Sequence, residues 1–463
     1  METKEFINHE QISNLLASSK EVDKKEVTDI LDKALSIKGL SMKEVATLAA
    51  IEDPELLDSL FKTANQVKEL IYGKRLVIFA PLYISNLCNN ECLYCAFRAK
   101  NKAISRRALS YEEITKETEE LLKQGQKRVL LVAGESYPQE GFNYVLNAID
   151  TVYDASYNGH QIRRININVA PLTIDEFKAL KEKNVGTYQI FQETYHPTTY
   201  AKMHVGGQKR NYNWRITATD RAMMAGIDDV GIGILFGLYD WRYEILALMQ
   251  HINHLEQTFG IGPHTLSVPR LEPASGAIYA ENPPYPVSDD DFKKIIAILR
   301  LAVPYTGIIL STRENAETRR NSLSLGISQI SAGSRTNPGG YNVASQEHGN
   351  QFSLGDHRSL DDVVADIANM GYLPSFCTAC YRLGRTGDEF MKLAKPGDIK
   401  KHCEINALAT FQEYLSDFAS EKTKQAGEEA ISQYIEGMSS QARQTVQKLT
   451  EKIKIEGQRD LFN

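Results

Sequence analysis

The chain has 463 residues, with 53 Lys and Arg against 59 Asp and Glu, so its formal net charge is −6. This balance offers no basic excess to neutralise a phosphate backbone, so we expect no nucleic-acid partner. No apolar run approaches the roughly 18 residues of a membrane span, so we expect no membrane partner. The polar N-terminus METKEFINHEQ shows no export signal. Composition and pattern together predict a cytoplasmic globular protein.

Residues 1–72 are predicted to form a helical extension, because their apolar positions recur at helical spacing. Residues 73–370 then alternate between short strands rich in Val, Ile and Leu and helical segments. The expected strands are 75–82, 128–133, 163–170, 187–192, 229–236, 265–270, 307–312 and 328–333. Capping-box sequences at Ser110 and Thr173 indicate two helix starts.

Eight strands with intervening helices are the number found in a closed TIM-type (β/α)8 barrel, which is the α/β fold we expect. An open doubly wound sheet is the alternative. Residues 371–463 begin with a cysteine-containing loop and continue as amphipathic helices, so we expect a mostly helical C-terminal module there.

The six cysteines fall into two groups of three, at 88–95 and 377–403. Pairing within a group of three always leaves one thiol over. In a chain without an export signal, such groups indicate metal binding or catalysis.

The first triad, Cys88, Cys92 and Cys95, has the spacing C-x3-C-x2-C and follows the first expected strand. That position is the C-terminal mouth of the barrel, where such folds place their chemistry. Three thiolates can hold three irons of a [4Fe–4S] cube and leave the fourth open. A structural zinc site is the alternative, although it normally needs four protein ligands.

In the second triad, Cys377 and Cys380 lie in the same expected loop with two residues between them, and Cys403 follows farther along the chain. Three thiolates again suit an Fe–S cluster with one open position, which we expect as an auxiliary cluster. Two alternatives stay open: a redox pair with an unrelated buried Cys403, and a zinc site completed by His402.

The C-x3-C-x2-C motif resembles the signature of the radical S-adenosylmethionine (SAM) superfamily. The resemblance implies that the open iron binds SAM and that SAM cleavage yields a 5′-deoxyadenosyl radical. It also implies a set of SAM-binding positions: Tyr94, Gly134, Glu135, Glu193, Gly231, Gly233 and, as a further candidate, Arg270.

The two triads together resemble the tyrosine lyases of [FeFe]-hydrogenase maturation, the HydG family. That resemblance implies cleavage of the Cα–Cβ bond of L-tyrosine to p-cresol and dehydroglycine, and conversion of dehydroglycine to CO and cyanide. It further implies an additional iron on the auxiliary cluster and an Fe(CO)2(CN) product bound to cysteine. A ferredoxin or flavodoxin reductant and other hydrogenase maturases would be its partners.

His264 resembles the family's histidine ligand to the additional iron. It directly precedes the strand expected at 265–270, so it should lie at the barrel floor, opposite the first triad. If the C-terminal module caps this floor, the barrel interior connects two metal sites.

The carboxylate of a buried substrate needs a cation. Arg313, at the end of the seventh strand, is the first candidate because its planar fork suits a carboxylate, and Ser331 could add a hydroxyl. Arg270 and Arg335 are alternatives. Competing functions are the thiamine-pathway tyrosine lyase (2-iminoacetate synthase) and a non-enzymatic Fe–S carrier.

Overall fold

The computed structural model describes residues 5–342 and 349–463. Its centre is a closed barrel of eight parallel strands, in which β10 pairs with β1 to complete the ring. The closure confirms the predicted (β/α)8 fold and excludes the open sheet. The barrel strands are β1 (Arg75–Ser85), β2 (Arg128–Ala133), β5 (Arg164–Asn168), β6 (Tyr188–Glu193), β7 (Val230–Ile234), β8 (Thr265–Ser267), β9 (Gly307–Leu310) and β10 (Gln329–Ser331).

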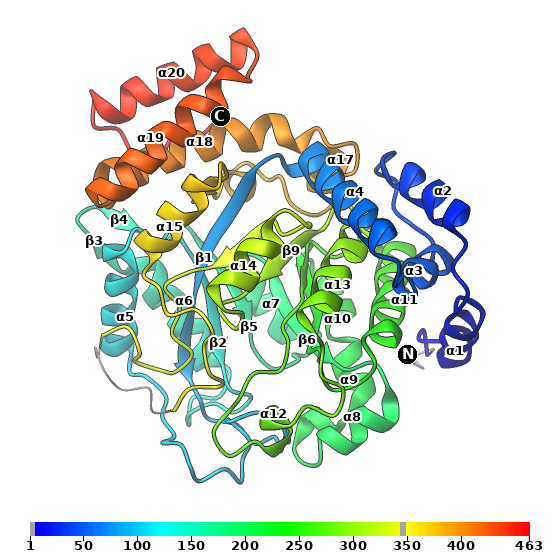
Figure 1. Cartoon of the computed structure of the whole chain (residues 1–463). Helices are drawn as coiled ribbons and strands as arrows, with labels where there is room; N and C mark the ends of the chain where they lie inside the picture. The colour runs from blue at the N-terminus through cyan, green and yellow to red at the C-terminus, as the bar shows by residue number, and fades with distance from the viewer. Residues whose placement is uncertain (1–4, 343–348) are drawn as a thin grey trace.

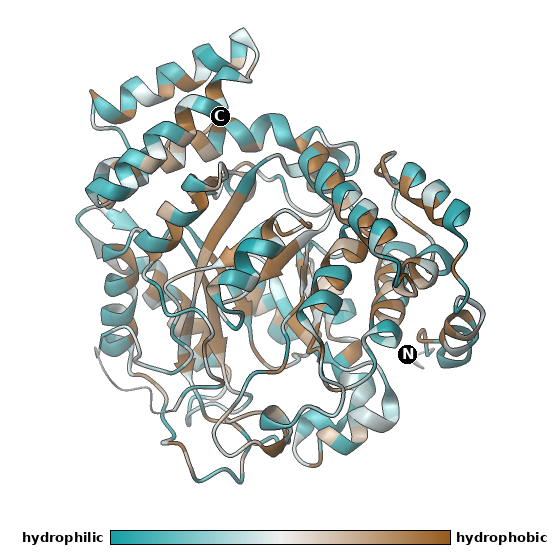
Figure 2. Ribbon diagram, viewed as in Figure 1, coloured by the Kyte–Doolittle hydropathy of each residue, from teal (hydrophilic) through white to brown (hydrophobic). Residues whose placement is uncertain are grey.

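Helices surround the barrel because its strands present apolar side chains to them, and Figure 2 shows brown strands enclosed by helices with teal outer faces. The main helices of this ring are α5 (Tyr111–Lys123), α6 (Asn143–Asp154), α7 (Ile174–Glu182), α10 (Ala218–Met224), α11 (Trp241–Phe259), α13 (Asp289–Ala302), α14 (Ala316–Leu323) and α15 (Leu360–Asn369). Ser110 and Thr173 begin α5 and α7 with the predicted capping boxes. A short hairpin, β3 (Ser156–Tyr157) and β4 (His160–Gln161), follows α6.

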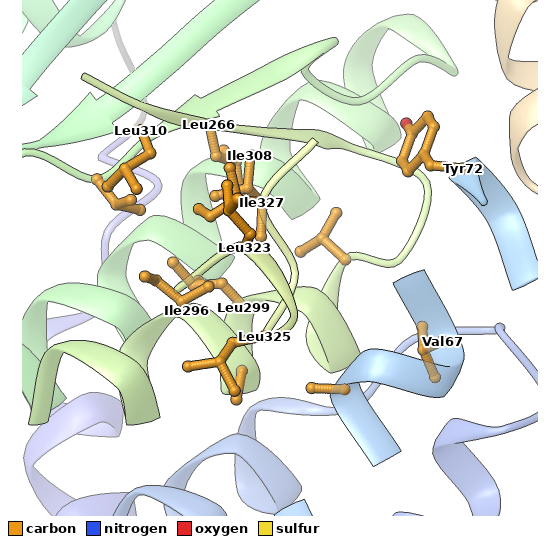
Figure 3. Close-up of a cluster of buried hydrophobic side chains, with 14 of the residues drawn as sticks. Val67, Tyr72, Leu266, Ile296, Leu299, Ile308, Leu310, Leu323, Leu325 and Ile327 are labelled. Carbon is orange, nitrogen blue, oxygen red and sulfur yellow. The ribbon is translucent and has the colours of Figure 1, made fainter. Parts of the chain in front are cut away.

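The N-terminal extension is helical, as its apolar spacing predicts. It comprises α1 (His9–Ser18), α2 (Lys24–Ala34), α3 (Met42–Ala49) and α4 (Pro54–Tyr72). Its apolar side chains belong to the same buried cluster as the barrel, and Figure 3 shows Val67 and Tyr72 of α4 in one cluster with Leu299 of α13 and Ile327. The extension therefore shares a core with the barrel.

The C-terminal segment covers the end of the barrel at which the strands begin. Its first strand, β11 (Leu373–Ser375), pairs with the start of β1 as a ninth strand, which the sequence pattern did not predict. Five helices follow: α16 (Ala379–Arg382), α17 (Gly387–Ala394), α18 (Ile399–Asp417), α19 (Glu421–Glu436) and α20 (Ser440–Lys454).

The opposite end of the barrel carries the loops after the strands and the short elements α8 (Pro197–Met203), η1 (Gln208–Arg210), α9 (Tyr212–Ile216) and α12 (Ile278–Glu281). Figure 1 shows α18–α20 at the top and α8 and α12 at the bottom. We call the end covered by α18–α20 the floor, and the end that carries α8 and α12 the mouth. Across the described ranges, no helix combines the length and apolar character that crossing a bilayer requires.

Candidate functional site

The first cysteine triad lies at the mouth, in the loop that follows β1. Cys88, Cys92 and Cys95 all line one cavity of about 180 Å³. Burial raises the pKa of Cys92 and raises that of Cys95 to about 11. Without a cation, these thiols would therefore stay protonated at neutral pH, whereas a bound metal centre would favour the thiolate.

A segment after α8 holds this loop in place. The amide of Leu93 donates to the carbonyl of Met203 at 3.0 Å, and the amide of Val205 donates to the carbonyl of Glu91 at 3.1 Å. Cys92 also forms an antiparallel bridge with His204. The thiol positions are thus fixed by backbone pairing, as a rigid ligand set requires.

The cavity fits an Fe–S cube better than a single zinc ion. Among residues 5–342 and 349–463, no three His, Cys, Asp or Glu side chains are placed to hold one metal ion. No histidine from the described ranges lines the cavity. A cube binds each thiolate at a different iron, so its thiols share a cavity without converging on one point.

Two buried carboxylates lie beside the thiols. Glu135 accepts hydrogen bonds from Asn90 at 2.6 Å and Arg215 at 2.8 Å, and Glu193 accepts one from Lys209 at 2.6 Å. Burial acts to raise the pKa of Glu135, but the charges of Arg215 and Lys209 hold it below its usual value. The mouth therefore keeps ionised oxygens next to the thiol triad.

Sequence analysis missed Asn90, Lys209 and Arg215. No motif marks them, and only the need of two buried carboxylates for counter-charges could have pointed to them.

Glu193 has φ +71°, and the register of β6 against β7 shifts between Phe191 and Glu193. A non-glycine residue in this conformation is strained, and such strain gathers at functional sites.

Each of the three glycines that sequence analysis assigned to SAM binding lies where a larger residue would clash with a neighbouring strand or loop. A Cβ on Gly134 would lie 2.1 Å from the carbonyl oxygen of Leu87, so only glycine lets β2 end this close to the cysteine loop. A Cβ on Gly231 would lie 2.4 Å from the hydroxyl of Thr265, and one on Gly233 2.7 Å from a carbonyl of β8. Gly134 lines the cavity, whereas Gly231 and Gly233 do not. Contact of the latter two with adenine stays a prediction.

Tyr94 lines the cavity with its ring, and its hydroxyl is 2.8 Å from Nε2 of His204. Arg313 lines the same cavity, and its guanidinium lies 3.3 Å from the ring centroid of Phe352. In the described part of the chain, no hydrogen bond or ion pair engages the Arg313 guanidinium. Ser331 also faces the cavity and accepts a hydrogen bond from the amide of Thr312 at 3.1 Å.

Arg270 lies outside the cavity. Its guanidinium pairs with Glu314 and with Asp289, the latter at 2.8 Å, and donates to the carbonyl of Val287 at 2.9 Å. These partners use its donors, so the geometry does not favour SAM binding by Arg270. Arg335 is also absent from the residues that line the cavity.

The second triad lies at the floor. Cys377 follows β11, Cys380 belongs to α16 and Cys403 to α18, and all three line a cavity of about 50 Å³. Cys403 therefore shares a site with the other two. His402 does not line the cavity, so the structure does not support a zinc site completed by His402.

His264 lines the same floor cavity. Its Nε2 is 3.4 Å from the hydroxyl of Tyr381, and its Nδ1 is 3.5 Å from a carboxylate oxygen of Asp229. Burial lowers the pKa of His264, so its imidazole is neutral and can act as a metal ligand.

Comparisons with known proteins agree with this geometry. The model of the radical SAM superfamily matches residues 82–251, and that of the "Biotin and Thiamin Synthesis associated domain" matches residues 267–373. The 2-iminoacetate synthase of Escherichia coli K12 is 31% identical over 354 residues, which cover 76% of this chain and 91% of that protein.

Two crystal structures are similar over nearly the whole chain. One, described as HydG, a maturase of the [FeFe]-hydrogenase, superposes with a TM-score of 0.96 at 48% identity, covering 99% of this chain and all of that chain (100%). The FeFe-hydrogenase maturase HydG from Carboxydothermus hydrogenoformans gives 0.84 at 40% identity, covering 97% of this chain and 99% of that one.

Proposed function

The chain belongs to the HydG family of radical SAM enzymes, and from this premise we propose that it cleaves L-tyrosine to p-cresol and dehydroglycine and converts dehydroglycine to CO and cyanide. The observation that carries the proposal is the pair of thiol triads at opposite ends of one barrel interior. The triad at the mouth is sufficient for a radical SAM reaction. The second triad at the floor therefore indicates a further metal-dependent step.

At the mouth, Cys88, Cys92 and Cys95 would hold a [4Fe–4S] cluster. When bound, this cluster and SAM supply a 5′-deoxyadenosyl radical. Glu135 and Glu193 would offer carboxylate oxygens to the cationic parts of SAM, and each forms a salt bridge inside the protein, Glu135 with Arg215 and Glu193 with Lys209.

Arg313 is placed to bind the tyrosine carboxylate. Its guanidinium lines the cavity and rests on Phe352, while its donors are not engaged by a carboxylate of the described chain. Arg313 is half-buried, and its guanidinium has no carboxylate partner in the described chain, so it can pair with the carboxylate of an anionic substrate. Ser331, which also lines the cavity, would add a hydroxyl contact.

At the floor, Cys377, Cys380 and Cys403 would hold an auxiliary [4Fe–4S] cluster. We propose that dehydroglycine yields CO and cyanide at this end of the barrel. An additional iron is cargo in this scheme, held by His264, and leaves as an Fe(CO)2(CN) unit bound to cysteine. The other hydrogenase maturases would receive it, a ferredoxin or flavodoxin would supply electrons, and the cytoplasm would be the location.

Anaerobic reconstitution with SAM, dithionite and tyrosine, assayed for p-cresol and CO together, tests the proposal. Both products support it. p-Cresol without CO would favour the activity of the 2-iminoacetate synthase relatives. If neither product forms and no 5′-deoxyadenosine is released, the result would favour the non-enzymatic Fe–S carrier.

A further inference from the structure

Buried polar atoms without hydrogen-bond partners gather around the floor cavity. Within the described ranges, Nε of Arg75, Nε of Arg128 and Nδ1 of His264 belong to residues that line the cavity. Three further atoms, Nε and Nη2 of Arg164 and Oδ2 of Asp229, belong to residues that do not line it, and Asp229 contacts His264. Each unsatisfied buried group costs about 1–3 kcal/mol, and more if it is charged. The floor is therefore built for a polar occupant that supplies the missing partners.

Arg75 reaches the cavity from the first residue of β1. It pairs in register with Leu373 of β11, and this pairing brings it beside the loop that carries Cys377. Its guanidinium lies 5.5 Å from the ring centroid of Tyr72 and lines the cavity with the three thiols. The aromatic ring fixes the direction of the side chain without using its N–H groups.

Arg128 reaches the cavity from the first residue of β2. One terminal nitrogen donates to the carbonyl of Cys377 at 2.8 Å, and this hydrogen bond ties the cysteine loop to the barrel. The residue is only 7% exposed. Its Nε–H has no partner, so part of the guanidinium stays free to donate to whatever the thiols hold.

Charge in this region is unbalanced. No Asp or Glu of the described chain lines the cavity, whereas Arg75 and Arg128 both do. Asp229 is the nearby carboxylate, and its oxygens face His264 at 3.5 Å and Arg164 at 3.9 Å. An Fe–S cube held by three thiolates carries net negative charge and would therefore compensate the two arginines.

We propose that Arg75 and Arg128 are positioning residues of the auxiliary cluster. Their N–H groups and positive charge retain the cluster at the floor and raise its reduction potential, because hydrogen bonds to the sulfurs and local charge tune Fe–S potentials. This inference rests on the proposed function, in which the Cys377 triad holds a cluster.

The test uses full-length protein reconstituted anaerobically as wild type, Arg75→Gln, Arg75→Lys, Arg128→Gln and Arg128→Lys. Two quantities are measured: the rate at which the auxiliary EPR signal is lost after removal of free iron, and its midpoint potential in a redox titration. The signal from the Cys88 triad is the internal reference. Arg163→Gln is the matched control, because Arg163 lies next to β5 and pairs with Asp460 at 3.0 Å, outside the cavity.

We expect each Gln variant to lose the auxiliary cluster roughly tenfold faster or more, as loss of a hydrogen bond to a charged group implies. Its potential should fall, and the Lys variants should restore part of the potential because they restore the charge. If both Gln variants retain the auxiliary cluster as long as the wild type and show the same midpoint potential, the inference is overturned and the proposed function is unaffected. A wild-type protein without an auxiliary cluster would overturn the proposed function and this inference together. Arg75 is only half-buried, so its variants keep the test valid should Arg128→Gln fail to fold.

Discussion

Arg128 and Leu130 lie two residues apart on β2, yet Arg128 lines the floor cavity and Leu130 lines the mouth cavity. Alternate residues of a strand point to the same face, here the barrel interior. Gln329 and Ser331 on β10 show the same relationship. At about 3.3 Å per residue, consecutive inward-facing residues lie about 6.6 Å apart along the strand, so neighbouring layers of side chains line different cavities. The two cavities therefore follow one another along the barrel interior.

Cys403→Ser should separate the two halves of the reaction. The serine hydroxyl is a poor ligand for iron in a cluster, so the floor cluster should be lost while the mouth triad is untouched. We expect p-cresol formation to continue and CO formation to fall at least about tenfold, because loss of a direct ligand should cost at least as much as the roughly 10–100-fold loss that follows removal of an outer-shell partner. Parallel assays of the two products check this. Equal loss of both would show that the two sites are not separable.

His264→Ala should act on the floor without removing the cluster. The imidazole is neutral and buried beside the triad, so its loss removes a candidate iron ligand but no thiolate. We expect less CO for each p-cresol formed, with the auxiliary EPR signal retained. If p-cresol and CO decline together, the role of His264 is not confined to the additional iron.

Arg313→Gln should weaken tyrosine binding. The substitution removes the charge but keeps a planar amide, so the pairing with a carboxylate is lost while the packing on Phe352 changes little. Loss of a charge-assisted hydrogen bond predicts a rise of tenfold or more in the KM for tyrosine. Steady-state p-cresol formation at varied tyrosine gives this value, and SAM affinity is the control. An unchanged KM would remove Arg313 from substrate binding.

Glu244 should make stability fall as pH rises. This carboxyl group is fully buried and accepts hydrogen bonds from the hydroxyl of Thr194 and, at 2.8 Å, from the amide of Tyr195. Burial raises its pKa from 4.5 to about 8. Between those values the folded state binds more protons than the unfolded state, so each unit of pH removes up to about 1.4 kcal/mol of unfolding free energy.

The variant Glu244→Gln cannot ionise and should flatten this dependence. Anaerobic urea unfolding at several pH values from about 5 to about 9 compares it with the wild type. The wild type should lose several kcal/mol more than the variant over this range. Parallel stability curves for the two proteins would show that Glu244 does not ionise differently on folding.

The order of strands and helices could be predicted because the barrel strands are short segments rich in Val, Ile and Leu, and because the capping boxes at Ser110 and Thr173 mark helix starts. β11 escaped prediction because its three residues contain a proline and gain their strand character from pairing with β1. The cysteines were predictable from their spacing. The salt-bridge partners Lys209 and Arg215 were not, because they reach the mouth only through tertiary folding.

The most direct test of the two-site account is to determine which metal centre each cysteine triad binds. Wild type, a Cys88/Cys92/Cys95→Ala variant and a Cys377/Cys380/Cys403→Ala variant are reconstituted without oxygen, then measured by EPR and for iron and zinc. We predict two distinct [4Fe–4S] signals in the wild type and loss of a different one in each variant. A single signal in the wild type, unaffected by removing the floor cysteines, or zinc in place of iron, would contradict the account.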